Sequence, residues 1–117
     1  MSEHRIRIVI VDDQALFRGG IAMLIQSQSD LELVGEAGNG ADALSLVSAT
    51  APDLVLMDLR MPVMDGIEAT ERLMAAPAPP RVLVLTTFDL DASAARAIRA
   101  GASGFVLKDA DPEFLVA

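Results

Sequence analysis

Five short apolar segments constrain the fold of this chain more strongly than any other feature of its sequence. They lie at residues 6–11, 31–37, 54–57, 82–85 and 104–107. Most of them are apolar on both faces, which is typical of strands buried on both sides in a parallel sheet. Between them, apolar side chains recur at helical spacing. The alternation predicts an α/β fold, with a parallel sheet and helices on both of its faces.

The helices between these strands have recognisable ends. The first is predicted from Ala15 to about Ser27, Asn39 is a predicted N-cap of the second, and Gly101 closes the fourth. A last helix begins at Asp111 and has about six residues, a length that is marginal for a helix by itself. We therefore expect the chain to end inside this truncated helix, with further sequence after it.

Length and composition exclude several classes of protein. The chain has 117 residues, of which 52% are hydrophobic, as in one globular domain and unlike a disordered segment. No apolar run has the roughly 18–20 residues that cross a membrane. With no cysteine, disulfides and thiolate metal sites are excluded, and we expect a cytoplasmic location. A net charge of −8 lacks the basic footprint of a nucleic-acid-binding domain.

Polar side chains that could bind a ligand or react follow four of the five predicted strands. Asp12 and Asp13 follow the first, Asp58 the third, Thr86 the fourth, and Lys108, the only lysine, the fifth. Open parallel sheets bind ligands outside the carboxyl ends of their strands, where strand order reverses. If the first and third strands are neighbours, three carboxylates meet in one crevice.

Such a crevice has an electrostatic cost. Two unit charges ~4 Å apart repel by about 4 kcal/mol at an effective dielectric of 20. An all-oxygen set of carboxylates suits a hard cation, Mg²⁺ or Mn²⁺. With Lys108 and the Thr86 hydroxyl beside it, the crevice would fit a phosphoryl group, and a carboxylate in its centre could act as a nucleophile.

Each of these residues also has an ordinary structural interpretation. Asp12 or Asp13 could cap the helix that follows, and Asp65 beside Gly66 is better explained as a turn and cap than as a catalyst. A lysine such as Lys108 is most often solvated at the surface. The coincidence of acids, hydroxyl and lysine at one sheet edge favours the functional interpretation.

Taken together, these motifs resemble the receiver domain of bacterial two-component response regulators. They are VDDQ at residues 11–14, LMDLRMPVMDG at 56–66, LTT at 85–87, and Lys108. The second motif is the most specific, and the resemblance covers nearly the whole chain. It implies a flavodoxin-like (βα)5 fold with strand order 2-1-3-4-5.

Four further segments resemble the branch of NarL/LuxR-type transcription factors. They are QALFR at 14–18, VGEA at 34–37, LTTF at 85–88 and GASGF at 101–105. The resemblance implies that residues 1–117 form one receiver domain and that a C-terminal DNA-binding domain lies outside this chain. A stand-alone receiver that acts through protein contacts alone is the alternative.

The resemblance also implies a phosphorylation site. Asp58 would accept a phosphoryl group from the phosphohistidine of a sensor histidine kinase. Mg²⁺ would be held by Asp12, Asp13, Asp58 and the backbone carbonyl of Arg60. The chain would assist only its own phosphorylation and dephosphorylation, and would not be an enzyme acting on other substrates.

Further residues would respond to the phosphoryl group. Thr86 would hydrogen-bond it, Lys108 would pair with it ionically, and Phe105 would turn inward as the aromatic switch. Arg60 and Phe88 would influence the rate at which the aspartyl phosphate is hydrolysed. Self-association as a dimer is expected, and no membrane contact.

Three details separate this chain from other proteins. Many receivers have a proline after the lysine, but Asp109 follows Lys108 here. Without a proline, a cis peptide bond at this position would cost more free energy. Arg60 stands where dehalogenase-like phosphatases carry a second aspartate, which argues against that class. Asp12-Asp13-Gln14 would repel the phosphate of a flavin nucleotide, which argues against a flavodoxin.

Overall fold

The computed structural model describes residues 5–86 and 92–108, which form a five-stranded parallel sheet with helices on both faces. The strand order is β2-β1-β3-β4-β5, as expected from the sequence. The elements are β1 (Ile6–Val11), α1 (Ala15–Gln26), β2 (Leu31–Ala37), α2 (Gly40–Thr50), β3 (Leu54–Asp58), α3 (Gly66–Met74), β4 (Arg81–Thr86), α4 (Ala92–Arg99) and β5 (Gly104–Leu107). The helix expected from Asp111 and the peptide between Lys108 and Asp109 lie outside the described residues.

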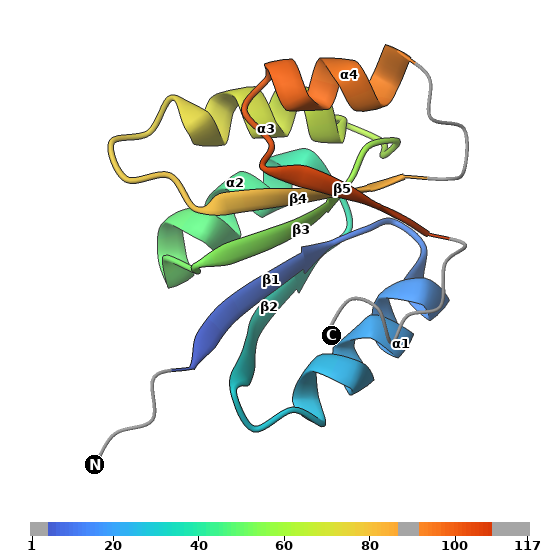
Figure 1. Cartoon of the computed structure of the whole chain (residues 1–117), viewed down its shortest axis with the longest axis vertical. Helices are drawn as coiled ribbons and strands as arrows, with labels where there is room; N and C mark the ends of the chain where they lie inside the picture. Colours follow the sequence, from blue (N-terminus) through green and yellow to red (C-terminus); the bar gives the residue numbers. More distant parts are fainter. Residues whose placement is uncertain (1–4, 87–91, 109–117) are drawn as a thin grey trace.

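Two apolar clusters cover the two faces of the sheet. Helix α1 lies on one face, while α2, α3 and α4 lie on the other (Figure 1). Alternate residues of the strands are divided between them: Val9, Val55 and Val84 belong to the larger cluster, whereas Ile10 and Leu56 belong to the cluster beneath α1. This explains why the central strand β3 is apolar up to Asp58, because both of its faces are buried.

Side chains fix the beginnings of two helices in the way the sequence predicts. Asn39 accepts a hydrogen bond from the backbone N–H of Asp42 at 2.8 Å, and Asp65 accepts one from Glu68 at 2.9 Å. After α4, Gly101 has φ of 118°, a conformation that favours glycine. Asp65 is therefore a helix cap, as expected. None of the helices in the described segments is long and apolar enough to cross a membrane.

Candidate functional site

The parallel pairing of the strands brings the polar strand ends together. In the register of the sheet, Val11 pairs with Met57, so that Asp12 and Asp58 follow at adjacent positions of β1 and β3. Asp58 in turn pairs with Leu85, which directly precedes Thr86. The strand order places β3 between β1 and β4, so the carboxyl end of β3 is the centre of the site.

Three carboxylates meet at this edge. Asp12, Asp13 and Asp58 each offer an oxygen within 4.8 Å of the other two. Asp12 is fully buried and Asp58 is 6% exposed, whereas Asp13 is open to solvent. The predicted meeting of three carboxylates in one crevice is confirmed.

Lys108 completes the cluster on its buried side. Its Nζ lies 2.9 Å from Asp12 Oδ2 and 3.6 Å from Asp58 Oδ2, and its side chain is only 10% exposed. The backbone N–H of Lys108 also donates to the carbonyl of Thr86 at 2.6 Å, which ties the end of β5 to the end of β4. The only lysine of the chain is thus a buried partner of the carboxylates, and the interpretation as a solvated surface lysine is wrong.

The side chain of Asp12 is incompletely satisfied. Its Oδ1 accepts a hydrogen bond from the backbone N–H of Gln14 at 2.8 Å. Its Oδ2 has Lys108 Nζ as an ion-pair neighbour, but at angles outside those of a hydrogen bond, so this buried atom accepts no hydrogen bond within the described segments. A buried carboxylate oxygen without a hydrogen bond is costly. A set of carboxylates in which one buried oxygen has no hydrogen bond is suited to bind a hard divalent cation.

Burial and crowding shift the ionisation of Asp58. The pKa of its carboxyl is raised from the ordinary 3.8 to about 6, and desolvation by burial is the largest cause. The negative charges of Asp12 and Asp13 act in the same direction, while Lys108 and the backbone N–H of Leu59 oppose it. The ionised form is thus held in an unfavourable environment, which a nearby cation would relieve.

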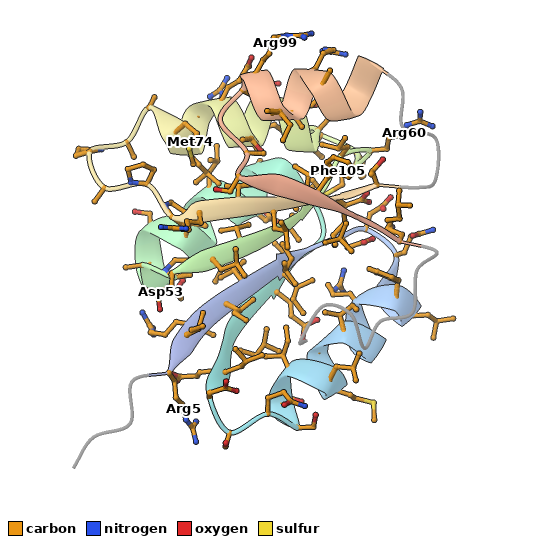
Figure 2. The ribbon with its side chains drawn as sticks, in the orientation of Figure 1. Arg5, Asp53, Arg60, Met74, Arg99 and Phe105 are labelled. Atoms are coloured by element: carbon orange, nitrogen blue, oxygen red, sulfur yellow. The ribbon has the colours of Figure 1, made fainter. Side chains whose placement is uncertain are left out.

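The remaining predicted residues lie around this centre. Thr86 is buried at the end of β4. Arg60 follows β3 with an exposed side chain, and Phe105 on β5 is 43% exposed, so its ring is not buried in this structure (Figure 2). Phe88 lies outside the described residues.

The loop after β3 depends on close backbone packing. A Cβ on Gly66 would lie 2.1 Å from the carbonyl oxygen of Asp58, and the Gly66 N–H donates to the carbonyl of Leu59 at 2.9 Å. Val63 has φ of 70°, which is unusual for a β-branched residue, and the Met64 N–H donates across it to Pro62 at 2.7 Å. The start of α3 is thereby packed against the carboxyl end of β3.

Three residues of α1 and its N-cap position also reach the site, and sequence reasoning assigned them no role. Gln14 Oε1 accepts a hydrogen bond from Lys108 Nζ, and the Phe17 ring centroid lies 4.7 Å from the same nitrogen. Arg18 donates to the backbone carbonyl of Asp12 and, at 3.0 Å, to Glu36. The available signals were their position directly after the aspartate pair and the QALFR segment at 14–18, which gave no side-chain role.

The fold and its acidic pocket define the class of receiver domains, and the chain belongs to the response regulator receiver domain family, which it matches over residues 8–117. It is 43% identical over 116 residues to YxjL of Bacillus subtilis, an uncharacterized transcriptional regulatory protein, covering 99% of this chain and 53% of that protein. It is 36% identical to the nitrate/nitrite response regulator NarL of Escherichia coli, covering 93% and 50%. The chain spans about half the length of these relatives.

Solved structures show the same relationship. The signal receiver domain of a response regulator named NarL from Mycobacterium tuberculosis superposes with a TM-score of 0.91 at 38% identity, covering 97% of this chain and 91% of that one. A LuxR-family two-component response regulator from Aurantimonas gives a TM-score of 0.88 at 39% identity, covering 96% and 80%. The expected family and its NarL/LuxR-type relatives are confirmed.

Proposed function

We propose that this chain is the phosphorylatable receiver of a transcription regulator and that Asp58 is its phosphoryl acceptor. The observation that carries the proposal is the cluster of Asp12, Asp13 and Asp58 against the buried Lys108. Asp58 lies at the centre of the cluster, and it is the member whose pKa is raised to about 6. At neutral pH it is therefore still ionised and able to act as a nucleophile.

In the proposed reaction an oxygen of Asp58 forms a bond to phosphorus while the bond from phosphorus to the imidazole nitrogen of a kinase phosphohistidine breaks. The free imidazole leaves and takes up a proton. Asp12, Asp13, Asp58 and the carbonyl of Arg60 would hold Mg²⁺ or Mn²⁺, which supplies positive charge against the phosphoryl oxygens. Lys108 would supply a second positive charge to the phosphoryl oxygens.

The proposed switch follows from the added charge. A phosphoryl group brings roughly −2 charge to Asp58, which attracts Lys108 and the hydroxyl of Thr86. Movement of Thr86 would leave room for the ring of Phe105, now half-exposed on β5. The conformations of the surface of α4 and β5 would then be populated in different proportions. Arg60 and Phe88 would influence how long the phosphoryl group persists.

The wider role is proposed from the relatives. Because they are transcriptional regulatory proteins about twice as long, we propose a C-terminal DNA-binding domain whose activity the receiver controls. A stand-alone receiver remains the alternative, and the sequence after Ala117 distinguishes the two. A sensor histidine kinase as donor, dimer formation, a cytoplasmic location and the lack of turnover of other substrates stay predictions.

Incubation with a small-molecule phosphodonor and Mg²⁺ tests the acceptor. The protein should gain one phosphoryl group that is stable in acid and labile in base, and peptide mapping after borohydride reduction should place it at Asp58. Asp58→Asn and chelation should each abolish labelling, whereas Asp53→Asn, at the other end of β3, should label normally. An Asp58→Asn variant that labels like the wild type would show that the assignment is wrong.

A further inference from the structure

Within residues 5–86 and 92–108, the side chain of Lys108 donates a hydrogen bond to an amide rather than to a carboxylate. Its Nζ donates to Gln14 Oε1, while Asp12 Oδ2 at 2.9 Å lies outside hydrogen-bond angles and Asp58 Oδ2 at 3.6 Å lies beyond hydrogen-bond distance. The amide of Gln14 is neutral and exposed, yet it accepts the hydrogen bond of the ammonium group. Neither carboxylate does. Gln14 therefore orients this group in the resting state.

Phe17 closes another side of the same nitrogen. Its ring centroid lies 4.7 Å from Lys108 Nζ, within the range of a cation–π contact. Phe17 is half-buried and packs against the apolar cluster beneath α1, so its ring is fixed by the core. Gln14 and Phe17, three residues apart at the start of α1, thus hold one ammonium group between them.

This arrangement opposes contact between Lys108 and any group on Asp58. Nζ is 3.6 Å from Asp58 Oδ2 and donates to Gln14, so a hydrogen bond to an oxygen attached to Asp58 requires one of its three N–H bonds to turn toward that oxygen. Of the three oxygens that the described residues place next to Nζ in hydrogen bonds or ion pairs, that of Gln14 is uncharged, so it is the weakest competitor against a new anion. The hydrogen bond to Gln14 is therefore the contact given up.

We propose that Gln14 and Phe17 form a resting-state cradle for Lys108, which holds the ammonium group just beyond hydrogen-bond distance of Asp58 until a phosphoryl group competes for it. They are positioning residues, because they act through Lys108. This inference rests on the proposed function, since it concerns the lysine of the same site. It predicts that loss of the Gln14 amide favours the phosphoryl-bound arrangement.

The cradle can be observed without metal or phosphoryl group. Because Lys108 is the only lysine, protein made with ¹³Cε-lysine gives a single side-chain NMR signal. Ring current from Phe17 should shift its Hε protons upfield, and Phe17→Leu should remove that shift. Gln14→Met, of similar length but without the amide, should move the signal towards that of free lysine. Gln26→Met, an exposed substitution in the last turn of α1, should leave it unchanged.

The same signal then follows titration with beryllofluoride, a phosphoryl mimic, in Mg²⁺. Gln14→Met should tighten its binding about fivefold, a fraction of the strength of a hydrogen bond to a charged group because water replaces part of it. Gln26→Met should bind as the wild type does. Gln14 carries no side-chain cap of α1, so its substitution removes no helix cap.

The outcomes separate the two proposals. A lysine signal unchanged by Gln14→Met and Phe17→Leu, or beryllofluoride binding that Gln14→Met leaves equal or weaker, would overturn the cradle. A wild-type protein whose signal ignores beryllofluoride would instead contradict the proposed function. The metal-free spectra of the variants would still decide whether the cradle exists.

Discussion

The two ends of β3 each carry an aspartate, and the two are treated in opposite ways. The carboxylate of Asp53, just before the strand, accepts a hydrogen bond from the Arg7 backbone N–H at 2.9 Å (Figure 2). The backbone N–H of Asp53 donates to the carbonyl of Arg7, and its carbonyl accepts from the backbone N–H of Arg81. The Arg7 guanidinium in turn caps the carbonyls of Thr50 and Ala51 at the end of α2. At this end the polar groups pair off and hold the structure together.

At the other end, Asp58 is crowded rather than paired. It is buried beside two further carboxylates, and the cation that the described residues place beside it, Lys108, is 3.6 Å away. Its pKa is raised to about 6, whereas Asp53 is exposed and paired. An aspartate at a strand end is thus a candidate for chemistry when its charge is left uncompensated. When hydrogen bonds and ion pairs compensate the charge, the aspartate has a structural role.

The largest expected effect comes from the backbone packing behind Asp58. In Gly66→Ala, the new Cβ would lie 2.1 Å from the Asp58 carbonyl oxygen, so β3 and α3 must separate. We expect the free energy of unfolding to fall by about 3 kcal/mol, measured by urea denaturation. Gly20→Ala, in α1 with no atom within 4 Å of the new Cβ, should instead raise it by about 0.5–1 kcal/mol. Equal effects at the two glycines would contradict the close packing.

Neutralising Asp58 should stabilise the metal-free fold. At pH 7, Asp58→Asn removes the cost of an ionised carboxylate in a buried, like-charged site, and we expect a gain of about 2 kcal/mol in the free energy of unfolding. Denaturation in a chelating buffer measures it. A loss of stability on this substitution would mean that Asp58 is a well-compensated structural group like Asp53.

The pH dependence of that gain has a defined sign. Because the folded protein raises the pKa of Asp58, the neutral carboxyl favours folding below about pH 4, and this contribution disappears as pH rises through about 6. The wild type should therefore match Asp58→Asn near pH 4 and fall behind it by pH 7. A difference between the two proteins that is constant with pH would contradict the raised pKa.

The smallest effect is expected at the paired end. Asp53→Asn keeps an acceptor for the Arg7 N–H but loses the charge that strengthens the bond, so the free energy of unfolding should fall by about 0.5 kcal/mol. The same denaturation assay detects it. A gain as large as that of Asp58→Asn would remove the difference between the two ends of the strand.

Much of this site follows from local sequence patterns. Apolar strands that alternate with helices predict the sheet, and the carboxyl ends of parallel strands necessarily share one edge, so Asp12, Asp58 and Lys108 could be expected together. Asn39 and Asp65 were predictable as caps because their hydrogen bonds reach only three residues ahead.

Other features depend on side-chain directions that periodicity does not contain. The contact between Gln14 and Lys108 joins residues 94 positions apart. The left-handed backbone of Val63 has no local signal, because a β-branched residue disfavours it. The burial of Lys108 was equally unpredictable from the sequence, since an isolated lysine is normally solvated.

We expect a divalent cation to relieve the repulsion among the carboxylates at the end of β3. The most direct measurement is an NMR titration of the Asp58 side-chain carboxyl carbon, assigned by its absence in Asp58→Asn, without metal and then with Mg²⁺. We expect the pKa of Asp58 to be about 6 without metal and clearly lower with Mg²⁺. A pKa near the ordinary 3.8 that Mg²⁺ does not change would contradict it.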